Sequence, residues 1–179
     1  LVEIDFLRTL FSTKSNLVER GTVSQQSKFN SEVRVSDIIW LNEECLPDHW
    51  NDIQEKIFQD VNSINDQFYG VDLYDIESLQ LTRYKSDNGG HYKYHEDSRS
   101  GIADNIIRKI SFVISLSDPE EYEGGDFYLG DNNISKDDPE SFKKGNIISF
   151  PSFMMHKVTP VTKGERMTLV GWCFGPRWR

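Results

Sequence analysis

The sequence has little of several features that define other classes of protein. It has only two cysteines, Cys45 and Cys173, without metal-type spacing, so reduced thiols in an intracellular chain are the simplest interpretation. No apolar run approaches the ~18 residues that a membrane-spanning helix needs. The N-terminal stretch lacks a secretory pattern, because Asp5 and Arg8 interrupt it. These absences predict a cytoplasmic protein without a membrane partner.

Positive charge is also scarce. The chain has 20 Lys and Arg against 29 Asp and Glu, which gives a net charge of −9. Its basic residues are scattered, with only Lys143-Lys144 and the tail Arg177-Trp178-Arg179 grouped, whereas a surface that follows phosphates needs clustered cations. We therefore expect no nucleic-acid partner. A hydrophobic content of 37% excludes a disordered chain, and 179 residues indicate one domain.

One segment predicts a helix. Between residues 47 and 69, six apolar side chains recur at steps of three and four residues, which is the period of a helix with one buried face: Trp50, Ile53, Ile57, Val61, Ile64 and Phe68. Pro47 suits the first turn and Gly70 a helix end. We expect this stripe to pack on the core. Residues 1–20 are compatible with a short helix or a strand, and polar residues 21–32 predict a loop.

The remainder of the chain predicts strands. Short apolar or alternating runs separated by turns with Gly or Pro occur at 33–41, 79–84, 91–97, 108–116, 126–129, 146–150, 156–159 and 167–174. Many short strands at such spacing indicate a β-sandwich or barrel. Two polar segments, 98–105 and 131–144, interrupt the series.

A candidate metal site lies in the strand over 91–97. Side chains two residues apart in a strand share a face, so His95 and Asp97 point the same way. His156, from another strand, would complete a set of two imidazoles and one carboxylate. Such a set leaves coordination positions open and suits non-haem Fe(II). The His-x-Asp pattern alone is a weak signal, because surface strands also contain it by chance.

A second signal is Arg166, ten residues after His156 at the start of an alternating run. A buried arginine needs an anionic partner, and its planar fork suits a carboxylate. Together with the candidate metal ligands, it describes a pocket for a dicarboxylate with one end on the metal and the other on the guanidinium.

Five ordered blocks complete the pattern. They are Tyr84 with Gly90–Asp97, Arg108–Ser111, Leu116–Pro119, Tyr122–Phe127, and a last block of Phe150–Ser152, His156, Val158, Pro160–Arg166 and Gly171-Trp172. In these blocks the segment 78–176 resembles the Fe(II)/2-oxoglutarate-dependent dioxygenases of the prolyl 4-hydroxylase type. It is most similar to the PKHD-type hydroxylases of bacteria and phages.

The resemblance implies a mainly β (α+β) fold, a double-stranded β-helix (jelly-roll) with an N-terminal supporting helix. Residues 1–179 would form a single dioxygenase domain. Within it, residues 1–77 would be an N-terminal segment with the packing helix, and residues 78–176 the catalytic jelly-roll core. The location implied is the bacterial cytoplasm, or the host cytoplasm for a phage-encoded chain.

The resemblance also assigns roles to seven residues, and strand alternation adds Thr168. Iron would be held by His95, Asp97 and His156; 2-oxoglutarate would contact Arg166 through its far carboxylate, Tyr84 through the phenol hydroxyl, and Trp172 as a pocket wall. Thr168 shares a strand face with Arg166 and is either a hydrogen-bond donor to the cosubstrate or a plain strand residue. Arg108 matches a substrate-contacting position, or is a surface residue. Ser115 stands where some relatives have a cosubstrate-binding tyrosine. His91 and His49 are expected to lie outside the site.

The implied reaction uses Fe(2+), 2-oxoglutarate and O2, with ascorbate as a candidate reductant, and releases succinate and CO2. Our first expectation for the partner is a proline-containing peptide or protein, hydroxylated at C4, with 98–105 and 131–144 as candidate lid and groove. The alternatives are another residue, a free small molecule, or a jelly-roll binding module without turnover; the intact triad and Arg166 argue against the last. The sequence leaves the oligomeric state open.

Overall fold

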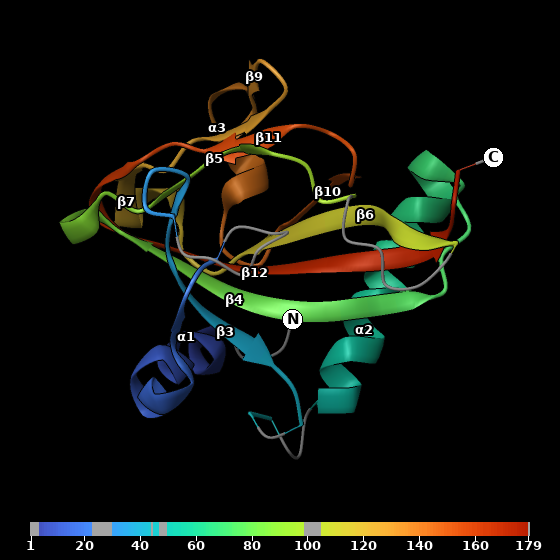
Figure 1. Ribbon diagram of the computed structural model, residues 1–179, viewed down its shortest axis with the longest axis horizontal. Helices are drawn as coiled ribbons and strands as arrows, with labels where there is room; N and C mark the ends of the chain where they lie inside the picture. The colour runs from blue at the N-terminus through green and yellow to red at the C-terminus, as the bar shows by residue number, and fades with distance from the viewer. Residues whose placement is uncertain (1–3, 23–29, 44, 47–49, 99–104, 179) are drawn as a thin grey trace.

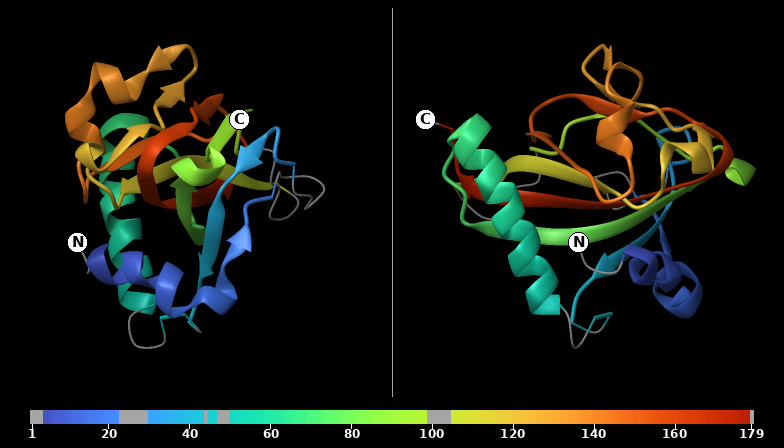
Figure 2. Two further views of the ribbon diagram at one scale, coloured as in Figure 1. Left: turned by 90° about the vertical axis from the view of Figure 1, so that its left-hand side faces the viewer. Right: turned by 180° about the vertical axis from the view of Figure 1, so that it is seen from behind.

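The computed structural model describes residues 4–22, 30–43, 45–46, 50–98 and 105–178. Within these residues the strands form two antiparallel sheets that stack face to face, and the longer helices lie outside the larger sheet (Figures 1 and 2). This arrangement confirms the predicted mainly β sandwich with a supporting N-terminal helical element. No helix in the described part of the chain is long and apolar enough to cross a membrane.

The larger sheet has the order β1-β3-β4-β12-β6-β10, and β7 pairs with the start of β12. Its strands are β1 Glu19–Arg20, β3 Asp37–Leu41, β4 Asp75–Lys85, β6 Ile106–Ser115, β7 Tyr122–Gly124, β10 Ile147–Pro151 and β12 Val161–Pro176. The smaller sheet has the order β2-β5-β11-β8-β9, with β2 Arg34–Val35, β5 His91–His95, β8 Phe127–Leu129, β9 Asn132–Asn133 and β11 His156–Val158. Most predicted strands are present, and β4 and β12 run well beyond their predicted bounds.

The helices were only partly foreseen. For residues 1–20 the sequence left a helix or a strand open. The structure has α1 Ile4–Thr13, a 3-10 turn at Ser15–Leu17 and the short β1 in this segment. The main helix α2 covers Trp50–Ile64 and continues as a π-helix over Asn65–Tyr69. Shorter turns follow at Ser86–Asn88, Pro119–Glu121, Ile134–Asp137 (α3) and Pro139–Phe142. Pro47 and His49 lie outside the described residues.

The predicted stripe on the main helix holds only in its first three turns. Ile53, Ile57 and Val61 are buried, but Phe68 is 69% exposed, so its assignment to the core was wrong. The π-helix is the cause, because its wider turn changes the direction in which successive side chains point. Asn65 takes the inward position instead, and its side chain hydrogen-bonds both the N–H and the carbonyl of Val71.

The predicted strand over 33–41 is divided at Ser36. β2 joins the smaller sheet, where Arg34 pairs with Tyr92, whereas β3 joins the edge of β4 in the larger sheet. Ser36 is buried between the two, and its carbonyl accepts a hydrogen bond from Gly21. This segment therefore bridges the sheets and carries Arg34 towards the space between them.

The polar segment 131–144 is not a free loop. It contains β9, α3 and a 3-10 turn, and Phe142 within it is 2% exposed. The Asn133 side chain accepts a hydrogen bond from the Lys136 N–H and so caps α3. A buried phenylalanine anchors the segment to the core, which makes it a poor candidate for a lid. The other candidate, 98–105, lies mostly outside the described residues.

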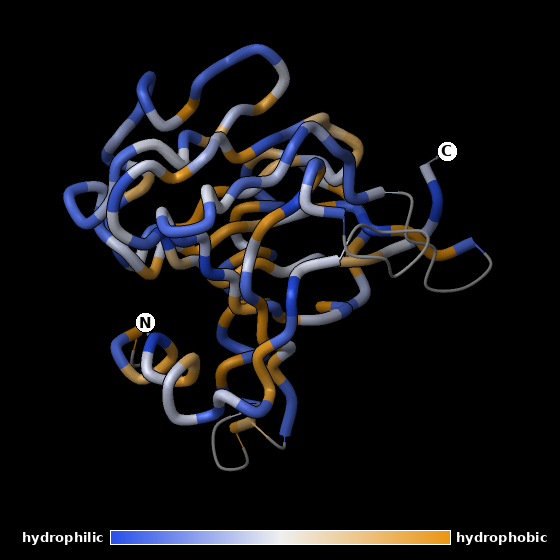
Figure 3. The backbone as a smooth tube through the Cα atoms, turned by 60° about the vertical axis from the view of Figure 1, so that its left-hand side comes forward, coloured by the Kyte–Doolittle hydropathy of each residue, from blue (hydrophilic) through white to orange (hydrophobic). Residues whose placement is uncertain are grey.

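Two hydrophobic cores lie on opposite faces of the larger sheet. The first joins the sheet to the helices and includes Leu10, Ile57, Leu81, Phe112 and Leu169. The second lies between the sheets and contains Tyr84, Val113, Phe127, Phe142, Phe150, Val158 and Val161. Figure 3 shows the matching hydrophobic segments along the central strands. The second core is smaller because polar side chains share the space between the sheets.

Gly171 lets the Phe112 and Leu79 side chains of the first core pack closely against β12. It lies at the centre of β12, opposite Leu79 on β4 and Phe112 on β6. A Cβ at this position would lie 2.3 Å from Phe112 Cζ and 2.8 Å from Leu79 Cδ2, so the Phe112 ring occupies the space of a side chain.

We predict that Gly171→Ala destabilises the protein by roughly 1–3 kcal/mol, the usual cost of overpacking a filled core. Urea unfolding measures this loss. In a Phe112→Leu background the same substitution should cost less, because the ring no longer occupies the space. An equal loss in both backgrounds would place the strain elsewhere.

Candidate metal centre and adjoining cavity

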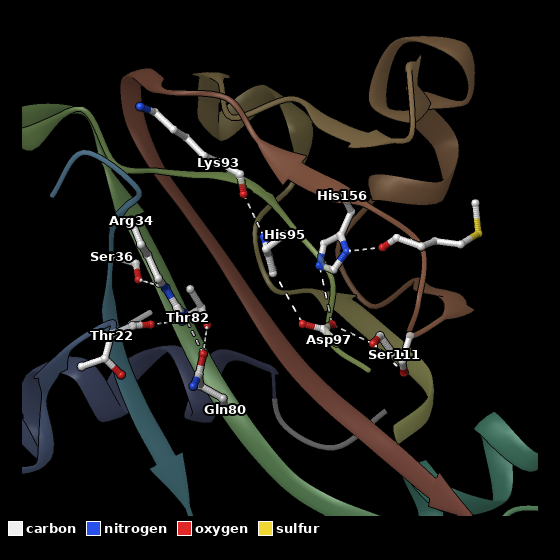
Figure 4. Close-up of polar contacts among 12 residues, drawn as sticks. Thr22, Arg34, Ser36, Gln80, Thr82, Lys93, His95, Asp97, Ser111 and His156 are labelled. Atoms are coloured by element: carbon white, nitrogen blue, oxygen red, sulfur yellow. Dashed lines mark hydrogen bonds and ion pairs between the residues drawn. The ribbon is translucent and has the colours of Figure 1, made fainter. Parts of the chain in front are cut away.

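Three metal-ligating side chains meet between the sheets. His95 ends β5 and His156 begins β11, and the two are paired residues in neighbouring strands. Asp97 follows the end of β5, and its N–H donates to the Ser152 carbonyl at 2.9 Å. The strand is two residues shorter than predicted, but the expected convergence of His95 and Asp97 holds (Figure 4).

The separation of the donor atoms fits a single metal ion. His95 Nε2 lies 3.7 Å from Asp97 Oδ1, and His156 Nε2 lies 3.6 Å from Asp97 Oδ2. One ligand atom from each of the three residues lies within 4.8 Å of the others. Two nitrogens and one carboxylate oxygen on one side of an ion leave the opposite side open, which is the donor set of non-haem Fe(II) sites.

The backbone orients both imidazoles. His95 Nδ1 lies 2.8 Å from the Lys93 carbonyl, and His156 Nδ1 lies 2.9 Å from the Met154 carbonyl. A carbonyl only accepts hydrogen bonds, so each Nδ1 carries the proton and each Nε2 keeps its lone pair. Both Nε2 atoms point towards Asp97, as a metal between them requires (Figure 4).

The ionisation states also suit metal binding. Burial and the neighbouring His156 lower the pKa of His95 to about 3, and the Arg34 guanidinium contributes to this shift. Burial opposes ionisation of Asp97, but His156, His95 and the Ser111 hydroxyl hold the pKa of its carboxyl below the usual range. Neutral His95 and ionised Asp97 are the forms that bind a metal.

Residues around the triad hold it in place. Ser111 on β6 donates a hydrogen bond of 2.7 Å to Asp97 Oδ2, and its hydroxyl lies 3.0 Å from that of Ser152. The Tyr92 ring stacks on His95 with ring centroids 3.5 Å apart, and Phe150 packs against His156 at 4.7 Å. Each ligand therefore has a partner that limits its rotation.

A cavity of about 210 Å³ adjoins the triad. Its lining includes all eight residues singled out in the sequence: Tyr84, His95, Asp97, Arg108, His156, Arg166, Thr168 and Trp172. The wall along β12 follows from strand alternation, because Arg166, Thr168, Val170 and Trp172 share one face. Ser115 does not line the cavity, and His91 lies outside the metal-ligating cluster, with its ring against the Gly89 carbonyl.

Three buried polar atoms on the β12 wall have no hydrogen-bond partner within the described residues. They are Arg166 Nε, Thr168 Oγ1 and Trp172 Nε1. Arg166 is 2% exposed, and its guanidinium lies 5.8 Å from the centre of the Tyr84 ring. Unpaired buried donors are costly, so this wall fits an anionic ligand rich in acceptors.

Arg108 has a different environment from the one expected of a free substrate contact. Its Nε and Nη2 donate to the two carboxylate oxygens of Glu77 at 2.5 and 2.8 Å. The guanidinium also lies over the Trp172 ring at 4.0 Å. Its charge is thus already compensated, and its contact with Trp172 stabilises the cavity wall.

Several lining residues were not foreseen. They include Arg34, Trp40, Gln80, Thr82 and Tyr92 from the cavity wall, and Ser111 beneath Asp97. Gln80, Thr82 and Tyr84 alternate along β4, so the predicted strand over 79–84 already carried the signal of a polar inner face. Arg34 had no such signal, because its position depends on the division of the chain at Ser36.

Comparisons with known proteins agree with this geometry. Residues 79–174 match the model of the 2OG-Fe(II) oxygenase superfamily. A PKHD-type hydroxylase of Idiomarina loihiensis is 31% identical over 97 residues, which cover 54% of this chain and 42% of the relative. A PKHD-type hydroxylase of Nitrosomonas europaea is 28% identical over 158 residues, which cover 86% of this chain and 63% of the relative. In these two matches the chain spans less than two thirds of the curated relative.

Solved structures show the same fold. A prolyl-4-hydroxylase of Pseudomonas putida superimposes with a TM-score of 0.64 at 18% identity, covering 98% of this chain and 84% of that one. A prolyl hydroxylase of Trichoplax adhaerens superimposes with a TM-score of 0.64 at 15% identity, covering 96% of this chain and 76% of that one. That structure is a complex with a peptide fragment of the hypoxia inducible factor oxygen degradation domain. These likenesses establish the jelly-roll of the 2OG-Fe(II) oxygenases predicted from the sequence.

We predict that His95→Ala, Asp97→Ala and His156→Ala each abolish Fe(II) binding in anaerobic titrations, because each removes one of three donors. His91→Ala is the matched control and should bind Fe(II) like the unmodified protein. Circular dichroism should show that the variants stay folded. Near-normal iron affinity in any of the three would contradict the ligand assignment.

Ser111→Ala should weaken Fe(II) binding about tenfold to a hundredfold, the usual effect of losing a group that orients a metal ligand. Ser115→Ala, on the same strand and equally buried, should leave iron affinity unchanged. Equal behaviour of the two variants would show that the bond from Ser111 to Asp97 does not support the site.

Proposed function

Since the chain belongs to the 2OG-Fe(II) oxygenase superfamily, we propose that it is an Fe(II)- and 2-oxoglutarate-dependent hydroxylase. One observation supports this most strongly. The His95, Asp97 and His156 cluster opens into the same cavity that contains the buried guanidinium of Arg166, whose Nε has no hydrogen-bond partner among the described residues. A metal site beside a buried cation fits a dicarboxylate that chelates iron at one end.

In this proposal His95, Asp97 and His156 hold Fe(II) through two Nε2 atoms and a carboxylate oxygen. When bound, iron, 2-oxoglutarate and O2 supply the oxidising chemistry, which releases succinate and CO2 and adds one oxygen atom to the substrate. The protein orients the reactants. Ser111 fixes the carboxylate of Asp97, and the carbonyls of Lys93 and Met154 fix the imidazoles.

The β12 wall would hold the cosubstrate. Arg166 would bind the far carboxylate of 2-oxoglutarate, since its Nε has no hydrogen-bond partner in the described part of the chain and Tyr84 lies beside it. The Thr168 hydroxyl and Trp172 Nε1 are further donors without a partner in the described residues, and they lie on the same face of the strand. Burial of these donors excludes water that would compete for the same acceptors.

We propose a proline-containing peptide or protein as the first choice of substrate. The structural likeness to two prolyl hydroxylases, one of them with a bound peptide fragment, supports this choice. Arg108 at the cavity, stacked on Trp172 and paired with Glu77, remains the proposed contact to the peptide. Hydroxylation of another residue or of a free small molecule is the second candidate, since the same cavity can hold one.

The test is release of succinate by the purified protein with Fe(II) and 2-oxoglutarate, measured across a panel of proline peptides and free amino acids. Mass spectrometry should detect the addition of about 16 Da to the accepted substrate, the mass of one oxygen atom. Replacing proline by alanine in an accepted peptide should abolish the addition. Faster turnover of free amino acids than of every peptide would favour the small-molecule candidate.

Arg166→Ala should weaken 2-oxoglutarate binding by about tenfold to more than a hundredfold. Loss of a charge-assisted contact costs ~1.5–3 kcal/mol, and more when the carboxylate stays buried. The Michaelis constant for 2-oxoglutarate measures this effect, and anaerobic titration with Fe(II) serves as the control, because Arg166 is not a metal ligand. An unchanged Michaelis constant would remove Arg166 from the cosubstrate site.

A further inference from the structure

The cavity contains a second buried guanidinium, that of Arg34. The residue is 7% exposed and has no role in the proposed handling of iron or 2-oxoglutarate. Its side chain donates to the Ser36 hydroxyl at 2.8 Å, to the Gln80 side-chain carbonyl at 2.8 Å and to the Thr22 carbonyl at 3.4 Å (Figure 4). All three acceptors are neutral.

Two other arginines near the site, unlike Arg166, have their charge balanced. Arg108 is paired with Glu77, and Arg83, on the opposite face of β4, is paired with Asp37 at 2.8 Å. Within the described residues, Arg34 forms no ion pair with either cavity carboxylate, Asp97 or Glu96. A buried charge with only neutral partners is costly, which makes an anionic ligand the expected counterpart.

The position of Arg34 places this charge close to the reacting centre. Its guanidinium lies over the Tyr92 ring at 4.6 Å, and His95 stacks on the same ring with centroids 3.5 Å apart. Arg34 also reaches from the smaller sheet to Gln80 on β4. A group bound by Arg34 would therefore lie in the cavity next to the metal ligands.

Arg34 and Arg166 serve different parts of the cavity. In the register of β12 and β4, Arg166 lies opposite Tyr84. Arg34 instead contacts Gln80, four residues before Tyr84 on β4. The two carboxylates of 2-oxoglutarate are already matched by the metal and Arg166. The guanidinium of Arg34 has five N–H groups, and its hydrogen bonds to Ser36, Thr22 and Gln80 are made by three of them, one each from Nε, Nη1 and Nη2.

We infer that Arg34 binds a carboxylate of the substrate, so that the enzyme selects substrates with an acidic group near the carbon to be hydroxylated. This inference rests on the proposed function and narrows its substrate class. The carboxylate is either the main-chain terminus of a free amino acid or peptide, or the side chain of Asp or Glu beside an internal proline. A bidentate contact with a planar guanidinium would fix its orientation.

The first experiment compares matched acids and amides. The pairs are L-proline and L-prolinamide, Gly-Ala-Pro and its C-terminal amide, and a peptide with an internal proline flanked by Asp and its Asn counterpart. Binding to the protein loaded with Mn(II) and 2-oxoglutarate without O2 is followed by tryptophan fluorescence, because Trp40 and Trp172 line the cavity. At least one acid should bind ten times more tightly than its amide, and the pair that does so identifies the source of the carboxylate.

The second experiment uses variants of Arg34 with that pair. Arg34→Gln should weaken binding of the acid at least tenfold and binding of the amide less than twofold. Arg34→Lys keeps the charge but not the planar fork, so its affinity for the acid should lie between those of the unmodified protein and Arg34→Gln. Arg83→Gln is the matched control, since it removes a cation from the other face of β4 while Lys85 still pairs with Asp37 at 3.3 Å. It should bind both ligands normally. Thermal unfolding of each variant checks that the fold survives.

Three results would overturn the inference. One is that no acid binds better than its amide. Another is that Arg34→Gln weakens acid and amide equally, which would make Arg34 a structural bridge. The third is that the substitution weakens 2-oxoglutarate more than the acid, which would assign Arg34 to the cosubstrate. Failure of the proposed function looks different, because the unmodified protein would then bind neither Fe(II) nor 2-oxoglutarate.

Discussion

The Asp97 carboxylate is the group on which the site depends. It lies 3.7 and 3.6 Å from the two imidazoles and accepts a hydrogen bond from Ser111, which belongs to the other sheet. The smaller sheet supplies the nitrogens, the larger one holds the carboxylate, and the backbone of Ser152 fixes the segment between them. A shift of one sheet against the other would thus break the bond from Ser111 that holds Asp97 beside the two imidazoles.

β12 contributes side chains to both the main core and the cavity, one set from each of its faces. Met167, Leu169 and Cys173 face the helices, while Arg166, Thr168 and Trp172 face the space between the sheets. The alternation is strict around Gly171, where the Phe112 ring fills the place of a side chain. The apolar face anchors the strand in the main core. This anchoring holds Arg166, Thr168 and Trp172 in place on the other face, each with one polar atom that has no hydrogen-bond partner among the described residues.

The position of a side chain could be predicted from the sequence where residues of a suitable chemical type recur at the two-residue period of a strand. The spacing of His95 and Asp97 and the alternation from Arg166 to Trp172 are local properties, so the shared direction of the first two and one cavity wall could be predicted. His156 comes from another strand, and the family resemblance supplied it. Prediction from the sequence failed where a backbone irregularity decides the outcome. The π-helix exposes Phe68, and the division of the chain at Ser36 sends Arg34 to the smaller sheet. Phe142 was hidden in a polar segment, because one buried ring leaves no periodic signal.

The cavity and the surface differ in charge. The chain carries a net charge of −9, yet Arg34 and Arg166 lie buried in one cavity with no ion pair among the described residues. A bound metal would add positive charge beside them. Asp97 would offset part of the metal's charge, and the two carboxylates of 2-oxoglutarate would face the metal and Arg166. Arg34 forms no ion pair with a described residue, and in the proposed reaction the substrate is the component still free to bring an anion to it.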